Sequence, residues 1–414
     1  MTANGRGRRP HGALVLGGDY KALGIVRSLG RHGIPVWVLR DEHVIASSSR
    51  YCRRAIDWPA AGDPERVAFL LRLGAQNGLA GWALFPTDDE TAAFLARNQE
   101  ELAPRFAITT PPWETLRWAY DKRLTYRRAG EIGVAHPHTY YPQDRAEVAA
   151  MDIAYPAILK PAIRAEQNRF TMSKAWRVDD RDSLLARYDE AAQLLDPSLI
   201  MVQELIPGVG TDQLSYAALC RDGQPIASVV ARRTRQWPMD FGRASTFVET
   251  IDDAEVEGSA TRVLATLGFT GIVEVEFKRD PRDGQLKLLD INPRAWGWHS
   301  LGRAAGVDFA YLLWLMLSGE ELPRIRGRAG VRWVRALTDV PTVLGEIRAG
   351  RLSVGAYLRS IRRPIEFAIL AADDPVPALI EVPAALALAW RRRTARPAER
   401  AVHVPFVSGH GASR

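Results

Sequence analysis

The fold is decided at residues 271–294, GIVEVEFKRDPRDGQLKLLDINPR. Apolar and charged residues alternate along its first half, and the turn-forming run PRDG separates that half from a second apolar run. The stretch therefore predicts a β-hairpin. Because side chains two positions apart share one face of a strand, we expect Glu274 and Glu276 to lie on one face, opposite Asn292 and Asp290 respectively.

The expected pairing of Glu276 with Asp290 brings two negative charges together. Like charges placed directly opposite one another destabilise a sheet, so something must neutralise them. A hard divalent cation such as Mg²⁺ would do so, because it prefers oxygen ligands, and Asn292 would add a neutral oxygen. Strict alternation also puts Leu288 on this face. The alternative is a solvated sheet face on which Lys278 is the counter-ion.

The residues that follow the hairpin favour chemistry over a solvated face. Pro293 ends the strand, and the next residue, Arg294, would place a planar cation beside the two carboxylates. A guanidinium at that position suits a transferring phosphoryl group or the carboxylate that accepts it.

The N-terminal part of the chain has a different pattern. An apolar run at 12–16, a Gly-Gly-Asp turn at 17–19, an amphipathic stretch at 21–33 and a second apolar run at 35–39 predict a parallel β-α-β unit. We therefore expect a small doubly wound domain over 11–112. A dinucleotide-dependent oxidoreductase is disfavoured, because the glycine spacing is wrong and no acidic residue ends the second strand.

Composition narrows the class of protein. The chain has 414 residues, enough for two or three domains, and a formal net charge of +7 that suits anionic substrates such as nucleotides. Only six of its 55 basic residues are lysines, so each lysine is informative. Nucleic-acid binding and a membrane-spanning helix are disfavoured. Two cysteines fit a reducing cytoplasm. Residues 1–10 lack an apolar segment, so we expect a short disordered leader and no signal peptide.

Five segments carry a resemblance to a known family. They are Asp121-Lys122, YPAILKP at 155–161, VQELIPG at 202–208, VEF at 275–277 and LDINPR at 289–294. In this order and at this spacing they resemble the ATP-grasp superfamily. Within it, the chain looks most like the D-aspartate-ligase-like and carbamoyl-phosphate-synthetase-like members, of the carboxylate–amine ligase type.

The resemblance implies a fold class, an α/β N-terminal doubly wound domain followed by α+β ATP-grasp domains. Residues 11–112 would be the N-terminal pre-ATP-grasp domain, 113–198 the small (A) subdomain, and 199–325 the C-terminal subdomain with the metal site. Residues 326–414 would be an Arg-rich C-terminal extension that either packs on the body or lies on a membrane surface.

The resemblance also implies a nucleotide site and a metal site. Lysines would hold the phosphates of ATP, the segment after one strand would bind its adenine, and an acid would bind its ribose. The hairpin would hold two Mg²⁺ ions, for which Mn²⁺ is an alternative. These residues are Lys122, Lys160 and Lys174 for the phosphates; Gln203, Glu204, Leu205 and Ile206 for the adenine; Asp212 for the ribose; Glu276, Asp290 and Asn292 for the metal; and Arg294 and Lys160 for catalysis.

One departure from the family concerns the flap that covers the phosphates. In the family it is usually rich in glycine, whereas residues 161–173 contain none. Arg164, Arg169 or Ser173 would have to cover the phosphates in place of bare backbone amides.

Other side chains are candidates for binding substrate. Arg233 and Arg235, near a strand end, could clamp a carboxylate or phosphate; the alternative is a solvated basic edge. Asp88, which follows the strand expected at 82–85, is a further candidate. The residues after Arg294 either line an acceptor pocket or pack in the core: Trp296, Trp298 and His299.

Together these features predict an ATP- and Mg²⁺-dependent ligase that joins a carboxylate to an amine, forming an amide or similar bond through an acyl-phosphate. The alternative is a non-catalytic, ATP-binding regulatory protein. The expected partners of the ligase are a small-molecule carboxylate and a small-molecule amine. Further copies of the same chain, in a homo-oligomer, are also expected partners. No nucleic-acid partner is expected. Contact with a membrane is expected only through the C-terminal extension, residues 326–414. The sequence does not identify the acid or the amine, because specificity depends on the shape of the pocket.

Overall fold

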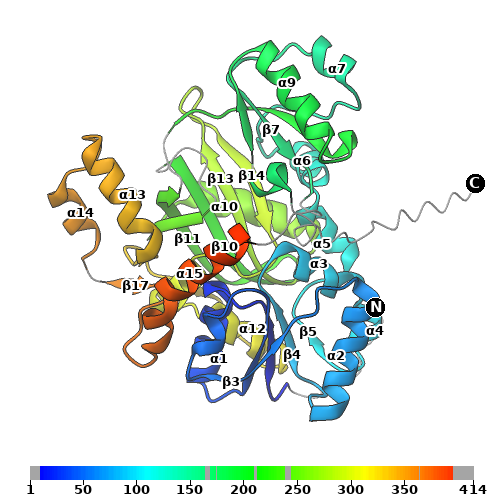
Figure 1. Ribbon diagram of the computed structural model, residues 1–414, viewed down its shortest axis with the longest axis vertical. Helices are drawn as coiled ribbons and strands as arrows, with labels where there is room; N and C mark the ends of the chain where they lie inside the picture. The colour runs from blue at the N-terminus through cyan, green and yellow to red at the C-terminus, as the bar shows by residue number, and fades with distance from the viewer. Residues whose placement is uncertain are drawn as a thin grey trace, which may run out of the picture.

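A computed structural model describes residues 10–163, 168–173, 175–208, 212–237, 244–362 and 364–394. In that part of the chain the strands form three sheets, of five, eight and four strands. Figure 1 shows the N-terminal domain and the small subdomain at opposite ends of the molecule, with the eight-stranded sheet between them.

The N-terminal domain is a parallel α/β domain, as the sequence predicts. Its sheet has the order β3-β2-β1-β4-β5, and all neighbouring strands are parallel. The strands are β1 (Ala13–Leu16), β2 (Val36–Arg40), β3 (Cys52–Asp57), β4 (Ala83–Pro86) and β5 (Ala107–Ile108), and the helices are α1 (Tyr20–Arg31), α2 (Asp63–Asn77), α3 (Asp89–Arg97) and α4 (Gln99–Leu102).

The strand order of this domain reverses between β1 and β4, and ligands of open α/β sheets bind beyond the carboxyl ends of the strands at such a point. Gly17 ends β1 with a φ of 128°, a left-handed conformation that glycine adopts without strain. Asp19 then caps α1 by accepting hydrogen bonds from the backbone amides of Lys21 and Ala22. The loops after β1 and β4 therefore lie side by side.

After the N-terminal domain come two consecutive helices, α5 (Trp113–Tyr120) and α6 (Lys122–Glu131). The chain leaves helical geometry at Asp121, whose side chain accepts a hydrogen bond from the amide of Arg123 and so caps α6. Asp is a strong helix N-cap because its carboxylate satisfies amides that lack a partner within the helix. Lys122 consequently lies at the first position of α6 and not inside a longer helix.

The small subdomain has a four-stranded sheet of order β6-β9-β7-β8. Helices α7 (Arg145–Ala150) and α9 (Arg181–Ala192) pack against each other beside it, and α8 (Arg169–Met172) lies in the flap. Lys160 stands on β7 opposite Met201 of β9. The strands are β6 (Thr139–Tyr140), β7 (Ala157–Pro161), β8 (Trp176–Val178) and β9 (Ile200–Glu204).

The eight-stranded sheet carries the hairpin quoted above. Its order is β14-β13-β10-β11-β12-β16-β17, with β15 paired to β11. Its strands are β10 (Gln213–Arg221), β11 (Gln224–Trp237), β12 (Ala244–Ile251), β13 (Gly271–Arg279), β14 (Leu286–Asn292), β15 (Ile325–Arg326), β16 (Arg332–Val334) and β17 (Ile365–Phe367).

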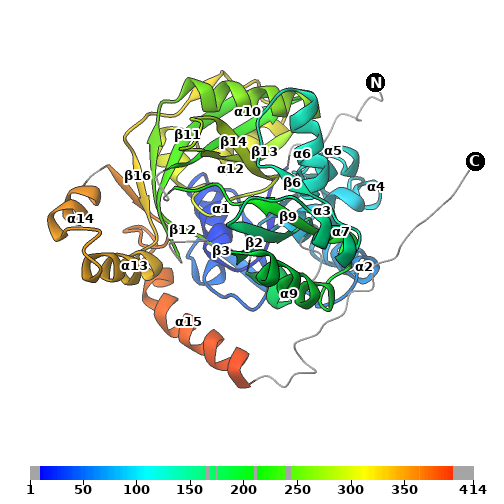
Figure 2. The same cartoon turned by 90° about the horizontal axis from the view of Figure 1, so that it is seen from above.

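The two faces of this sheet bury different cores. On one face Val273, Val275 and Phe277 of β13 pack against helix α10 (Ala254–Leu267). The other face packs against α1 and α12 (Phe309–Leu317), and Trp296 and Trp298 are buried there. Glu274 and Glu276 alternate with the valines, so they face the side on which the N-terminal domain lies (Figure 2).

The residues beyond 325 are part of the same body as far as they are described. Strands β16 and β17 extend the large sheet past β12, and α11 (Leu301–Ala305) lies beside β17. Three further helices follow: α13 (Ala336–Arg348), α14 (Val354–Ser360) and α15 (Val376–Thr394). Just before α15, the buried Asp374 accepts hydrogen bonds from Arg27 of α1, from Ser49 and from the amide of Arg50.

No helix among the described residues is long and apolar enough to cross a bilayer.

Candidate active site

The acidic hairpin has the predicted pairing, with one irregularity. Glu276 lies opposite Asp290, and Glu274 lies opposite Asn292. The register shifts next to this pair, because Phe277 is opposite Leu288 and Leu289 is an extra, bulged residue. The expectation that Leu288 shares the face of Asp290 was therefore wrong, since Leu288 is fully buried in the core on the α10 side.

Helix α6 holds the bulge in place. The Tyr126 hydroxyl donates a hydrogen bond of 2.8 Å to the backbone carbonyl oxygen of Leu289. One turn earlier, Lys122 Nζ lies 2.8 Å from Oδ1 of Asp290. Residues four apart lie on the same face of a helix. The break at Asp121 thus starts a helix whose first turn presents a lysine to the acidic pair.

Glu274 is the most enclosed carboxylate of the site, at 2% exposure. Trp298 Nε1 donates to its Oε1 at 2.9 Å, and Asn292 Nδ2 donates to its Oε2 at 3.0 Å. Burial and the neighbouring charge of Glu276 raise the pKa of Glu274 to about 7, because both disfavour the ionised form.

Two cationic side chains and one amide that donates hydrogen bonds stabilise the carboxylates in this structure. Arg233 Nη2 lies 3.2 Å from Oε2 of Glu276, and Asn292 Nδ2 donates to Oε1 of the same carboxylate at 2.8 Å. Together with Lys122 on Asp290, these groups offset the like charges that the hairpin brings together. Lys278, the counter-ion considered from the sequence, points instead to backbone carbonyl oxygens.

Arg294 joins the hairpin to the N-terminal domain. Its Nη2 donates to Asn292 Oδ1 at 2.9 Å, and its Nε donates to Asp89 Oδ1 at 3.0 Å, at the start of α3. Burial works against the charged form, but the carboxylates around the guanidinium, Asp89 first among them, outweigh it and raise the pKa of Arg294. The guanidinium is therefore a fixed positive charge at the junction of two domains.

The N-terminal domain contributes a second lysine to this junction. Lys21 Nζ donates to the backbone oxygen of Thr87 at 2.6 Å and lies 3.3 Å from Asp19 Oδ2. Asp88 has a structural partner, because its carboxylate accepts from the Thr91 amide at 2.7 Å and caps α3. It is the next residue, Asp89, that reaches Arg294.

Arg233 and Arg235, the two arginines proposed as a clamp, contact different partners. Arg233 is opposite Val248 and Arg235 is opposite Phe247, so Thr234 is an extra residue and the two side chains fall on opposite faces of β11. Arg233 contacts Glu276, whereas Arg235 donates to both oxygens of the buried Asp339, at 2.7 and 2.8 Å.

The segment expected to bind adenine, residues 203–206, spans the end of β9. Glu204 is held by the amide of His138 at 2.9 Å, by Arg282 at 2.7 Å and by Lys287 at 3.0 Å. Burial would raise its pKa, but these donors lower the pKa below the ordinary value for Glu. Its carboxylate would have to change partners in order to accept from an adenine amino group.

The other expected contacts of the nucleotide lie around the same segment. Gln203 is buried and donates to Thr139 Oγ1 at 2.8 Å, and the amide of Leu205 faces the Pro156 oxygen. The Ile206 oxygen accepts from Lys278 Nζ at 2.9 Å. Asp212 is partly buried and directly precedes β10. Two expected residues of the phosphate site, Lys174 and Arg164, lie outside the described residues.

The residues that could hold a metal ion are two carboxylates and one amide. Glu276 and Asp290 supply oxygens across the hairpin, and Mg²⁺ typically takes one or two carboxylates and completes its shell with water and phosphate. Among the described residues no three His, Cys, Asp or Glu side chains gather into a set that could hold a metal by itself. The donor set therefore fits Mg²⁺ that arrives with a nucleotide.

Asn292 needs a rearrangement to join such a set. Its amide nitrogen faces Glu274 and Glu276, while its oxygen accepts from Arg294. Only the oxygen can bind a cation, so the amide would have to turn over.

The sequence analysis gave no role to four residues that the structure places at or near the acidic hairpin and the expected adenine segment: Lys21, Asp89, Glu274 and Lys287. Glu274 was expected on the right face but was not assigned a role. Lys287 reaches Glu204 because the bulge at Leu289 changes the alternation of β14. Lys21 was one of only six lysines, and this scarcity was the signal that could have singled it out.

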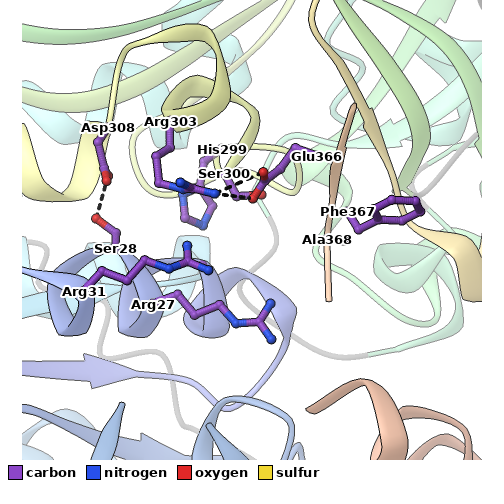
Figure 3. A pocket seen from close by; sticks show the side chains of 11 residues that line it. Arg27, Ser28, Arg31, His299, Ser300, Arg303, Asp308, Glu366, Phe367 and Ala368 are labelled. Carbon is purple, nitrogen blue, oxygen red and sulfur yellow. Dashed lines mark hydrogen bonds and ion pairs between the residues drawn. The ribbon is translucent and has the colours of Figure 1, made fainter. Parts of the chain in front are cut away.

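An enclosed cavity lies elsewhere, between α1, α11 and β17 (Figure 3). Arg303 on its wall is paired with Glu366, and Ser28 donates to Asp308. Its volume is about 20 Å³, room for about one water molecule. The cavity is too small for a nucleotide.

Two solved structures resemble this chain in fold. The biotin carboxylase domain of Hydrogenobacter thermophilus 2-oxoglutarate carboxylase, solved with MgADP, ADP and bicarbonate, superposes with a TM-score of 0.61 at 16% identity, covering 77% of this chain and 73% of that one. The L-amino acid ligase of Bacillus licheniformis superposes with a TM-score of 0.57 at 15% identity, covering 75% of each chain. These likenesses establish the fold.

The class of protein that the family model and the ligase relatives support is the ATP-grasp superfamily, so the resemblance found in the motifs is confirmed. More particularly, residues 198–339 match the family described as ATP-grasp in the biosynthetic pathway with Ter operon.

Two curated relatives are similar in sequence. The D-aspartate ligase of Enterococcus faecium (strain Aus0004) is 23% identical over 248 residues, 56% of this chain and 58% of the relative. The D-alanine–D-alanine ligase B of Xanthomonas campestris pv. campestris is 29% identical over 186 residues, 41% of this chain and 54% of the relative. The matched regions thus span less than two thirds of these relatives.

Proposed function

We propose that this protein is an ATP-dependent ligase that joins a carboxylate to an amine through an acyl-phosphate. The observation that carries the proposal is the pairing of Glu276 with Asp290 across one hairpin, with Arg294 directly beyond it. A site of this kind stabilises the charge of a phosphoryl group in transfer and needs no protein nucleophile. The curated relatives named above are themselves ligases.

The reaction has two steps. A carboxylate oxygen of the acid attacks the γ-phosphorus of ATP, the bond from that phosphorus to the bridging oxygen breaks, and ADP leaves. The amine nitrogen then attacks the acyl carbon, the bond from that carbon to the phosphate oxygen breaks, and phosphate leaves. The nitrogen gives up a proton, so the products are an amide, ADP and phosphate.

The residues of this chain would act by position and charge. Arg294 is held by Asp89 and Asn292, so its guanidinium is oriented before substrate arrives and can bind the acid or the γ-phosphate. Lys160, with Lys174 and Lys122, would bind the phosphates. Mg²⁺, held by Glu276 and Asp290, would supply further positive charge to the phosphate oxygens.

The two domains would meet around the substrates. The carboxyl ends of β1 and β4 present Lys21 and Asp89 beside Arg294, at the position where open α/β sheets bind ligands. We infer that the acid or the amine lies between this edge and the hairpin. The adenine would lie against residues 203–206, and Asp212 would bind the ribose.

The experiment that tests this proposal is a screen for ADP release. Purified protein with ATP and Mg²⁺ is offered amino acids and small carboxylates, singly and in pairs. We expect ADP release to rise for a matching acid and amine, with a product whose mass is their sum less one water, and to stop when EDTA removes Mg²⁺. If ATP with Mg²⁺ raises the melting temperature but no pair releases ADP, the protein is the non-catalytic ATP-binding alternative.

Replacing Arg294 by Lys should lower kcat for ADP release by about 100-fold. Lysine keeps the charge but cannot bridge Asp89 and Asn292 with two fixed donors. Steady-state kinetics measure the loss, and circular dichroism checks that the fold remains. Arg145→Lys, at an exposed pair with Asp189, is the matched control and should leave kcat unchanged. Equal kcat values for Arg294→Lys and wild type would remove Arg294 from the reaction centre.

A further inference from the structure

Helix α15 (Val376–Thr394) has one face packed and one face exposed. On its packed side Ala378, Ile380 and Ala384 contact the core shared with α1 and α12. On the same side Glu381 lies 3.8 Å from Arg335. The helix is therefore fixed to the body along one side, as Figure 2 shows at the edge of the molecule.

The exposed side of α15 is a continuous apolar stripe. Leu379, Val382, Leu386 and Trp390 are 74%, 53%, 66% and 67% exposed. Their spacing of three, four and four residues places them on one face of the helix. At 1.5 Å per residue the stripe is roughly 17 Å long. Exposed apolar side chains in such an array mark a surface that binds something.

Exposed apolar residues are concentrated in the C-terminal part of the described chain. Of the thirteen large apolar side chains exposed in the described part of the chain, five lie on α15: Val376, Leu379, Val382, Leu386 and Trp390. The concentration argues against chance, because single exposed apolar residues scattered over a surface need no explanation.

The charges on α15 indicate the kind of partner. The only acidic residue of the helix is Glu381, which is turned inward to Arg335, so no acid lies on the apolar stripe. Directly after Trp390 come three arginines, Arg391–Arg393. Arg391 is exposed, and Arg392 is exposed while paired with Glu42. An apolar stripe that ends in tryptophan and arginine is typical of a helix that lies in the interface of an anionic membrane.

A second copy of this chain fits the stripe less well. A stable interface between protein chains needs about 800 Å² from each partner, and four partly exposed side chains supply well under that area. A membrane imposes no such minimum, because apolar side chains and cations add their contributions separately.

We propose that α15 docks this protein on an anionic lipid membrane. The stripe from Leu379 to Trp390 would enter the boundary between headgroups and acyl chains, and the exposed Arg391 would bind lipid phosphates. The packed face keeps α15 on the body, so the ligand-binding edge of the protein would be carried to the membrane surface with it. This inference does not depend on the ligase reaction.

Flotation with vesicles tests the proposal on the full-length protein. We expect binding to vesicles of equal phosphatidylcholine and phosphatidylglycerol, little binding to phosphatidylcholine alone, and weaker binding as NaCl is raised. Leu386→Asp should lower the bound fraction at least tenfold, and Arg391→Glu should lower it on anionic vesicles. Leu358→Asp, a change of the same kind at a similarly exposed site on α14, should bind like wild type.

Three results would overturn the proposal. The first is a wild-type protein that stays with the unbound fraction on anionic vesicles. The second is an equal loss of binding in Leu386→Asp and Leu358→Asp, which would assign the effect to general surface polarity. The third is light scattering that finds a dimer which Leu386→Asp splits, which would make the stripe a contact between copies. Circular dichroism and ADP release should be unchanged in Leu386→Asp, so a misfolded variant would be recognised.

Discussion

Asp290→Asn should reduce ATP turnover by at least 100-fold while leaving the fold intact. The change removes one negative charge from the acidic pair but keeps the size of the side chain and an oxygen that can accept from Lys122. Loss of a charge that positions and neutralises a phosphoryl group costs about 3 kcal/mol or more of barrier, which is 100-fold or more in rate. ADP release at saturating ATP measures the effect.

The control for this variant is Asp179→Asn, at an exposed position beside Arg177. It should release ADP at the wild-type rate. Lys160→Ala should behave like Asp290→Asn if Lys160 binds the phosphates. Near-normal ADP release from Asp290→Asn, with a normal circular dichroism spectrum, would show that the acidic hairpin is not the reaction centre.

Asp374→Ala should lower the free energy of unfolding by about 3–5 kcal/mol. Asp374 is fully buried and accepts from Arg27 Nε at 2.9 Å, from Ser49 Oγ at 2.7 Å and from the Arg50 amide at 2.9 Å. Its removal takes the carboxylate away from two further donors and from the buried Arg27 guanidinium, which keeps only its Nη2 hydrogen bond to the backbone oxygen of residue 374. Urea unfolding followed by tryptophan fluorescence measures the loss.

The adjacent acid provides the matched control. Asp373 also pairs with an arginine of α1, Arg31, but its side chain is 42% exposed, so Asp373→Ala should cost at most about 1 kcal/mol. Replacing both buried partners, as in Arg27→Met with Asp374→Leu, should recover part of the stability, because no unpaired charge remains. Equal losses for Asp373→Ala and Asp374→Ala would contradict the assigned role of burial.

The hairpin shows how far local sequence patterns reach. Alternation and the turn at 281–284 were enough to predict that Glu276 faces Asp290, because both depend only on residues close together in the chain. They did not reveal the bulge, since Leu288 and Leu289 are both apolar and either could have faced the core. What holds the bulge is Tyr126, a residue 163 positions away in the chain.

Local signals were also enough for the parallel N-terminal domain and for the hairpin of β13 and β14 in the large sheet. The short strands β16 and β17 were missed, because three residues carry too little pattern to be distinguished from a loop. β16 pairs with β12, and β17 pairs with β16, so both strands are defined by segments far from them in the chain.

Sequence motifs were enough to predict the resemblance to the superfamily, from five short segments in order, and the acidic pair followed by Arg294, which lies within one hairpin. The contacts of Asp89 with Arg294, of Arg233 with Glu276 and of Arg235 with Asp339 became visible only in the folded chain. They join residues 205, 43 and 104 positions apart, and one extra residue separates the faces of the two arginines, for which a linear pattern has no signal.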